Sequence, residues 1–217
     1  MHEFVEWPKT KRLFRDIVVT EKLDGTNSAI HISKGSAVEF PSVSFDAYPL
    51  KHGEFFVDGH IWYVTAQSRK RIITPGKTTD NFGFAAWVYD NAADLVRILG
   101  PGLHFGEWWG RGIQRGYGLD ERRFSLFNTA RYVEQFPMLE NGMELEGGRV
   151  DVVPVLYSGT FAEAAICQAL TDLGDYGSVV APGFMNPEGI CVYHTQTRSV
   201  FKVTLDNQDA GKWEAAA

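Results

Sequence analysis

Short apolar segments with the character of β-strands dominate this sequence and constrain its fold more than any other feature. Eight segments are predicted as strands: 17–23, 28–32, 61–66, 103–108, 124–127, 150–155, 189–194 and 199–203. Residues 194–198 are predicted to join the last two as a hairpin, with Glu188 and Lys202 near one end of it. Strands and helices do not alternate regularly enough for a doubly wound parallel sheet. The sequence therefore predicts an α+β fold with antiparallel sheets and flanking helices.

Two segments carry helical signals. Apolar residues recur at helical spacing from Phe84 to Leu99, and Gly100-Pro101 ends the run. Residues 160–163 form a capping-box pattern, which predicts a second helix that runs to Leu173 with Gly174 as its stop. Both helices are expected to flank the sheets.

Length and composition fit one intracellular domain. The chain has 217 residues, of which 44% are hydrophobic, and it can bury a full core. No apolar stretch approaches the roughly 20 residues that cross a bilayer, and the N-terminus lacks a signal-peptide pattern. We therefore expect a cytoplasmic monomer without a membrane partner, whose two cysteines, Cys167 and Cys191, are small buried thiols without a disulfide.

The segment 21–27, Glu-Lys-Leu-Asp-Gly-Thr-Asn, places a single lysine between two carboxylates where a predicted strand breaks into a turn. A lysine amine with the ordinary pKa of roughly 10.4 is protonated at neutral pH, so a site must favour its neutral form before it can attack. Lys22 is thus a candidate nucleophile. The stretch alone fits an ordinary Asp-Gly hairpin turn equally well.

Segments further along the chain favour the first interpretation. The heptapeptide resembles motif I, KxDGxN, of the covalent nucleotidyltransferases, and its ending in Asn27 is most similar to the RNA-ligase branch. Further landmarks of that family follow in its order at residues 67–69, 105–108, 125–128, 187–190 and 200–203. The resemblance implies a nucleotidyltransferase fold, that of the ATP-grasp-like adenylation domain of DNA and RNA ligases, as a single domain over residues 1–217 without a C-terminal OB-fold.

The resemblance also implies roles for individual residues. Lys22 would attack the α-phosphate of ATP and carry AMP, and Lys202 would assist as a second catalytic lysine and phosphate ligand. Glu188 would anchor magnesium, with manganese as an alternative metal. The remaining nucleotide-binding residues are Glu21 beside the adenine, Asn27 in motif I, Arg69 at the phosphates, Glu107 on the ribose and Phe127 stacked on the adenine.

Several of these residues also have structural interpretations. Phe127 lies in an apolar run, and without the resemblance it would be interpreted as a core aromatic. Arg69 belongs to a short basic run of the kind that usually faces solvent. Lys202 is harder to dismiss, because a lysine in an apolar strand is costly without an anionic partner. The first lysine position of motif V is occupied by Val200, which departs from the pattern of many relatives.

The net charge of −6 disfavours nucleic-acid binding unless positive residues gather on one face. They are clustered at residues 9–15, 69–77 and 111–123. The glycine- and arginine-rich stretch 110–118 is either a loop that approaches a sugar-phosphate backbone and stacks one base on its tyrosine, or a flexible surface connection.

By resemblance, the protein is an ATP-dependent RNA ligase of nucleic acid repair that seals 5′-phosphate and 3′-hydroxyl ends or nicks through lysyl-AMP, with RNA the favoured substrate. A ligase for DNA nicks is the alternative enzyme, since the same core serves both. A catalytically weak nucleic-acid-binding module is the alternative from another class. The intact Lys22, Glu107, Glu188 and Lys202 speak against that last interpretation.

Overall fold

The computed structural model describes residues 2–37, 48–49 and 53–206 of the chain. Its contacts cluster in two compact units. The first unit combines residues 1–22 with 154–217, and the second consists of residues 23–153. The prediction of a single domain is not tested by this division and stays a prediction. None of the helices in these described ranges is long and apolar enough to span a membrane.

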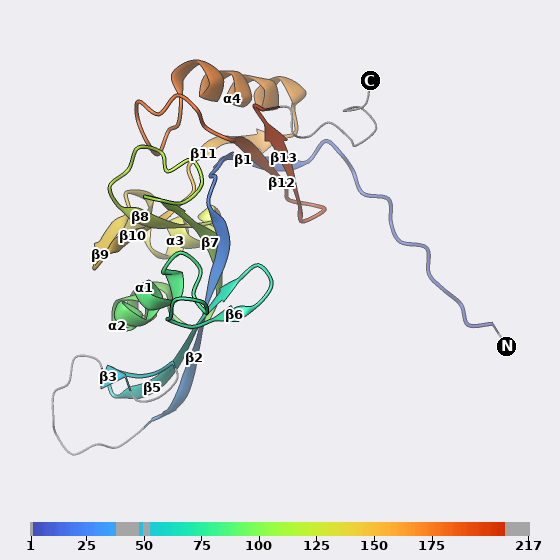
Figure 1. The fold of residues 1–217 in the computed structure, drawn as a ribbon. Coiled ribbons are helices and arrows are strands. Elements are labelled where there is room, and N and C mark those ends of the chain that lie inside the picture. The colour runs from blue at the N-terminus through green and yellow to red at the C-terminus, as the bar shows by residue number, and fades with distance from the viewer. Residues whose placement is uncertain (1, 38–47, 50–52, 207–217) are drawn as a thin grey trace. The chain divides into compact units, whose positions relative to one another are not determined.

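The first unit is a four-stranded antiparallel sheet with one helix (Figure 1). Its strand order is β11–β1–β12–β13, and the bounds are β1 Asp16–Lys22, β11 Val155–Thr160, β12 Gly189–His194 and β13 Ser199–Thr204. Helix α4, Glu163–Tyr176, packs Ala169 and Leu173 against Ile17, Val19 and Val192 of the sheet. Because side chains alternate along a strand, the residues between these buried ones point to the sheet face that α4 does not cover.

The second unit is a nine-stranded sheet with the order β3–β4–β5–β2–β7–β8–β10–β9, and β6 pairs with β5. The strand bounds are β2 Thr26–Ala37, β3 Tyr48–Pro49, β4 Glu54–Val57, β5 His60–Ser68, β6 Ile72–Ile73, β7 Gly102–Gly110, β8 Arg122–Leu126, β9 Met143–Leu145 and β10 Gly148–Val152. The helices are α1 Phe84–Asp90, α2 Ala92–Leu99, α3 Thr129–Gln135 and the 3₁₀ turn η1 Pro137–Glu140. Neighbouring strands are antiparallel except β8 and β10, so the predicted antiparallel α+β class is confirmed.

The core of the second unit lies between its helices and one face of the large sheet. Ile30, Trp108, Phe124 and Val150 occupy successive strands on that face, and all four are buried. Trp108 and Phe124 both pack against Phe84 of α1, with ring centroids 5.4 and 5.1 Å away. The helices therefore cover this face, and the polar residues between the core positions point to the other.

The single helix predicted over residues 84–99 is wrong, because Asn91 divides it into α1 and α2. The Asn91 side chain donates to the backbone oxygens of Trp87 and Glu146, at 2.8 and 3.0 Å, and accepts from the Glu146 backbone nitrogen at 3.0 Å. An asparagine that bonds to backbone groups in this way competes with helix continuation. Sequence spacing showed the apolar face but not this partner.

Three other local predictions also need correction. The second helix begins at Glu163 and continues through Gly174 to Tyr176, where Gly177 caps it with φ 82°. The segment 150–155 is two strands, since Pro154 follows β10 and offers no backbone donor for a ladder. Cys167 is exposed on α4 rather than buried, and Cys191 is half-buried.

Candidate active site

Lys22 is the last residue of β1, and its amine contacts Glu188 directly. Lys22 Nζ lies 2.5 Å from Glu188 Oε2, although 166 positions separate the two residues in sequence. Their side chains are 24% and 15% exposed. The register explains the meeting, because Lys22 pairs with Gly189, the residue directly after Glu188. The predicted nucleophile and the predicted metal-binding carboxylate therefore form one ion pair within the first unit.

Lys202 lies on the same sheet face as Lys22. Lys202 pairs with Cys191, which pairs in turn with Thr20, two residues before Lys22. Residues directly opposite one another and residues two apart on a strand share a face, so Thr20, Lys22, Cys191 and Lys202 all point away from α4. The predicted hairpin is confirmed, with Glu188 and Lys202 toward its open end.

Glu21 points the opposite way from Lys22 and is buried. Its carboxylate accepts hydrogen bonds from Ser178 Oγ at 2.6 Å and from the Val179 backbone nitrogen at 2.9 Å. Burial raises the pKa of the Glu21 carboxyl above its ordinary value, and these hydrogen bonds oppose that rise. Glu21 thus anchors the segment after α4, and its role beside the adenine stays a prediction.

In the second unit, Asn27 and Glu107 stand side by side on the sheet face that the helices leave uncovered. Asn27 on β2 pairs with Glu107 on β7, and Glu107 pairs with Ser125 on β8. Phe127 follows two residues after Ser125, and its backbone nitrogen donates to the Phe105 oxygen at 3.0 Å. Three predicted nucleotide-binding residues are therefore brought to one region of this face.

Exposure decides between the interpretations of Phe127. Its side chain is 40% exposed, whereas Phe124 in the same run is fully buried, so Phe127 is not a core aromatic. Arg69 is exposed in the turn between β5 and β6, and β5 lies next to β2 in the sheet. This placement agrees with a solvated basic turn, and a role for Arg69 at the phosphates stays a prediction.

A buried polar cluster that sequence reasoning missed continues the row of Asn27, Glu107 and Ser125. Asp151 on β10 pairs with Ser125. The Ser125 hydroxyl donates a hydrogen bond to the Asp151 carboxylate and accepts one from Trp109 Nε1 at 2.7 Å. Arg149 Nε lies 3.7 Å from the Asp151 carboxylate. Asp151 was discoverable, because it interrupts the apolar run Val150 to Val153 in the same way that Lys202 interrupts its own strand.

The loop over residues 110–118 differs from both sequence interpretations. Tyr117 is only 2% exposed and packs edge-on against Trp109, with ring centroids 4.8 Å apart, so its ring is not available to stack a base. Ile113 is fully buried. The loop is therefore a packed element of the second unit rather than a flexible connection.

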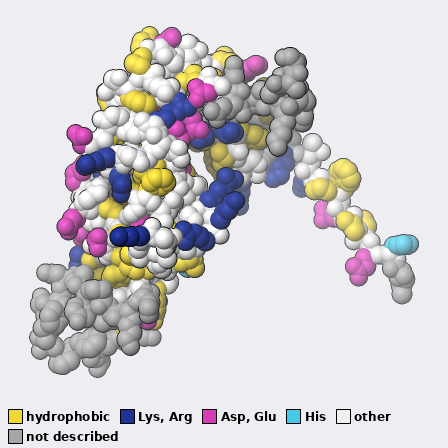
Figure 2. Space-filling view, in the orientation of Figure 1, with side chains coloured by type: hydrophobic (Ala, Val, Ile, Leu, Met, Phe, Trp, Pro, Cys, Tyr) yellow, Lys and Arg dark blue, Asp and Glu magenta, His cyan; other side chains and the backbone are white. Residues whose placement is uncertain are grey.

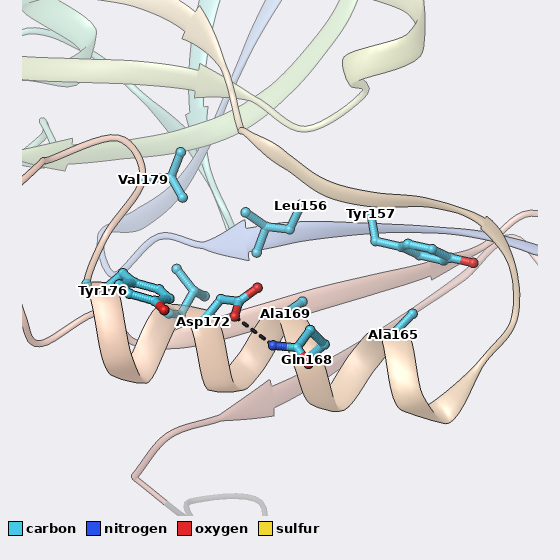
Figure 3. A pocket seen from close by; sticks show the side chains of 10 residues that line it. Leu156, Tyr157, Ala165, Gln168, Ala169, Asp172, Tyr176 and Val179 are labelled. Carbon is cyan, nitrogen blue, oxygen red and sulfur yellow. Dashed lines mark hydrogen bonds between the residues drawn. The ribbon is translucent and has the colours of Figure 1, made fainter.

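A groove of about 520 Å³ between α4 and β11 is lined by Leu156, Ala169 and Tyr176 among others (Figure 3). Gln168 and Asp172 on its wall bond each other at 2.8 Å. None of the predicted site residues lines it. Across the described ranges, no group of three or more His, Cys, Asp or Glu side chains could hold a metal ion by itself. The groove is therefore lined by other residues than those of the predicted site.

The first unit holds a lysine at a strand end paired with a glutamate, and the second unit holds a polar row on a helix-free sheet face. The model of the RNA ligase family matches residues 15–204, and the chain belongs to that family. No curated protein sequence matches it.

Solved structures show the same fold. A mutant RNA ligase of Naegleria gruberi with ATP and Mn has a TM-score of 0.53 and 16% identity, over 91% of this chain and 53% of that one. A second mutant of that ligase, with AMP and Mn, gives a TM-score of 0.52 and 16% identity over 89% and 51%. An apo mutant gives a TM-score of 0.51 and 18% identity, over 88% of this chain and 50% of that one. The chain thus spans about half the length of these ligases.

Asp151 should make stability depend on pH. Burial raises the pKa of its carboxyl from the ordinary 3.8 to about 6, against the hydrogen bond from Ser125 and the charges of Arg123 and Arg149. Between about pH 4 and 6, the native state then holds a proton that the unfolded chain has lost. As the pH rises through this window, the free energy of unfolding of the wild type should fall relative to that of Asp151→Asn. Urea titrations at several pH values measure both. Parallel pH profiles of the two proteins would contradict this assignment.

Proposed function

We propose that this protein is an ATP-dependent RNA ligase that works through a lysyl-AMP intermediate. One observation carries the proposal: the 2.5 Å pair between Lys22 and Glu188, which joins the motif I lysine to the motif IV glutamate. Family membership supports it, as do the structures of Naegleria gruberi RNA ligase with ATP and with AMP.

The reaction proceeds in three steps, the first two at the α-phosphorus of ATP and the third at the 5′-phosphate of the nucleic acid. The neutral Lys22 amine attacks the α-phosphorus of ATP, forms a P–N bond and releases pyrophosphate. A 5′-phosphate oxygen then takes AMP from the lysine, and finally a 3′-hydroxyl displaces AMP and closes the strand. Phosphoryl transfer depends on positioning and on charges near the phosphate, and Lys202, on the same sheet face as Lys22, supplies one such charge.

The donor set at Glu188 fits a magnesium ion that is held together with the nucleotide phosphates. Magnesium usually takes one or two protein carboxylates and fills its remaining positions with water and phosphate oxygens. Glu188 offers one carboxylate, and no cage of three acidic or imidazole side chains exists in the described part of the chain. When bound, the metal would offset negative charge on the phosphates.

The residues of the second unit suit a nucleoside. Glu107 is half-buried on β7, where its carboxylate can accept hydrogen bonds from ribose hydroxyls. The partly exposed ring of Phe127 offers an apolar face for a purine. Asn27 stands beside Glu107 and provides both a donor and an acceptor.

Incubation with magnesium and ATP labelled at the α-phosphate should attach the label to Lys22. The bond should resist alkali and break in acid, as a phosphoramide does, and denaturing electrophoresis would show it. Lys22→Ala should abolish the label, because no amine remains at the end of β1, whereas Lys34→Ala, at an exposed lysine of β2, should label normally. If Lys22→Ala were labelled to the same extent as the wild type, the proposed mechanism would be wrong.

The metal role of Glu188 predicts a rate effect with a distinctive magnesium dependence. Glu188→Ala should lower single-turnover formation of lysyl-AMP by at least about tenfold, or about 1.4 kcal/mol. The magnesium concentration for half-maximal rate should also rise, whereas loss of the contact with Lys22 alone would leave it unchanged. Glu163→Ala, at an exposed glutamate of α4, is the matched control. A folded Glu188→Ala protein with the wild-type rate and magnesium dependence would exclude Glu188 from the site.

Nucleic acid ends are the proposed substrate, with phosphate contacts from the basic clusters. Arg69, Lys70 and Arg71 are exposed around the start of β6, where Figure 2 shows Lys and Arg side chains gathered on the surface. Such contacts give binding that weakens steeply with salt and reads little sequence. The cluster offsets locally the net charge of −6.

The RNA assignment can be tested with one nick built four ways, with RNA or DNA on each side and a pre-adenylylated 5′ end that bypasses ATP. We expect fastest sealing when the 3′-hydroxyl strand ends in a ribonucleotide, because the 2′-hydroxyl distinguishes RNA from DNA. Faster sealing of the all-DNA nick would favour the DNA-ligase alternative. Absence of sealing with every substrate would contradict the ligase proposal.

A further inference from the structure

Asp24, two residues after Lys22, is held at two points by the loop that follows β7. The Asp24 backbone nitrogen donates to the Tyr117 hydroxyl at 2.9 Å. The Asp24 carboxylate accepts from Arg115 Nε at 3.0 Å, and the two side chains are 26% and 15% exposed. Both the backbone and the side chain of the motif I aspartate are therefore fixed by residues more than ninety positions away in sequence.

The loop that provides these contacts adopts a strained backbone. Gln114 and Tyr117, on either side of Arg115, have left-handed φ angles of 44° and 53°. For residues other than glycine such conformations are strained, and they persist only where the surroundings enforce them. Backbone hydrogen bonds hold the loop together: the Ile113 nitrogen donates to the Gly110 oxygen at 3.0 Å, and the Gly116 nitrogen donates to the Ile113 oxygen at 2.9 Å. Simple connection of β7 to β8 does not require this conformation.

The turn held by this loop is also packed tightly against β7. A Cβ atom on Gly25 would overlap the Trp108 carbonyl oxygen and lie 2.7 Å from the Trp109 Cβ and 3.1 Å from the Glu107 Cγ. Beyond the turn, Asn27 pairs with Glu107 in the β2–β7 ladder. The conformation of Asp24 and Gly25 thus determines how Asn27 and the backbone of motif I meet Glu107.

We propose that Arg115 and Tyr117 are positioning residues that hold the motif I turn against Glu107 and thereby set the rate of lysine adenylylation. This inference rests on the proposed function. Neither residue needs to touch the nucleotide. Reactions of this kind are sensitive to placement, and a misplacement of about 1 Å can cost about a hundredfold in rate.

The test compares loop variants of the full chain. Tyr117→Phe keeps the ring against Trp109 and removes the acceptor for Asp24, and Arg115→Met removes the charge at similar length. Arg115→Lys restores the charge. Asp120→Asn is the matched control, because it removes the charge of an exposed residue in the same loop that makes no contact with Asp24. Single-turnover lysyl-AMP formation is measured against ATP concentration, and hydrogen exchange is measured at the Asp24 amide.

We expect Arg115→Met and Tyr117→Phe to lower the maximal rate at least about tenfold with a much smaller change in the half-saturating ATP concentration. Arg115→Lys should recover part of the loss, Asp120→Asn should match the wild type, and Tyr117→Phe should speed exchange of the Asp24 amide. A purely structural role would reduce the fraction of protein that labels without changing its rate constant.

Two results would overturn the inference and are distinguishable. If the wild type labels and both variants label within about twofold of its rate constant, the positioning role is wrong and the proposed function stands. If the wild type forms no lysyl-AMP, the proposed function fails before any variant is compared, and the positioning role fails with it.

Discussion

The alternation of side chains along β-strands is the constraint on which both halves of this structure depend. In each unit, helices bury one face of a sheet and leave the other for polar residues. Lys22 and Lys202 belong to such a face in the first unit, and Asn27 and Glu107 in the second. A shift of one residue in any of these pairings would turn a reactive side chain into the core. Register therefore decides which side chains lie on the open face of each sheet.

Charged residues inside apolar strands mark this arrangement, and the chain stabilises them in different ways. Lys22 is balanced by Glu188 across the ladder. Asp151 is buried and depends on a hydroxyl and on nearby arginines. Glu21 is satisfied by the segment after α4. Each of these groups would be expensive without its partner, so the polar residues and their surroundings must form together.

The sequence predicted the longer strands of both sheets, because each is an apolar stretch with turn residues at its ends, but it missed the short strands β3, β4, β6 and β9 and helix α3. It also predicted the hairpin of β12 and β13, with Glu188 and Lys202 near one end of it. It could not predict the break at Asn91, whose partner Glu146 is distant in sequence. The same limit explains the missed contacts of Tyr117 and Asp151, because long-range hydrogen bonds leave no local periodicity. Phe127 shows a further limit, because an apolar run does not indicate which of its aromatic residues is exposed.

The division of the chain into units has a consequence for the order in which it can fold. The first unit takes its strand β1 from before residue 23 and β11, β12 and β13 from after residue 153, so the second unit is an insertion in its sequence. During synthesis, β1 must wait until more than 130 intervening residues have emerged before either neighbour exists. The inserted unit is continuous in sequence and can collapse earlier. Lys22 at the end of β1 can therefore meet Glu188 only after all residues of the second unit have been synthesised.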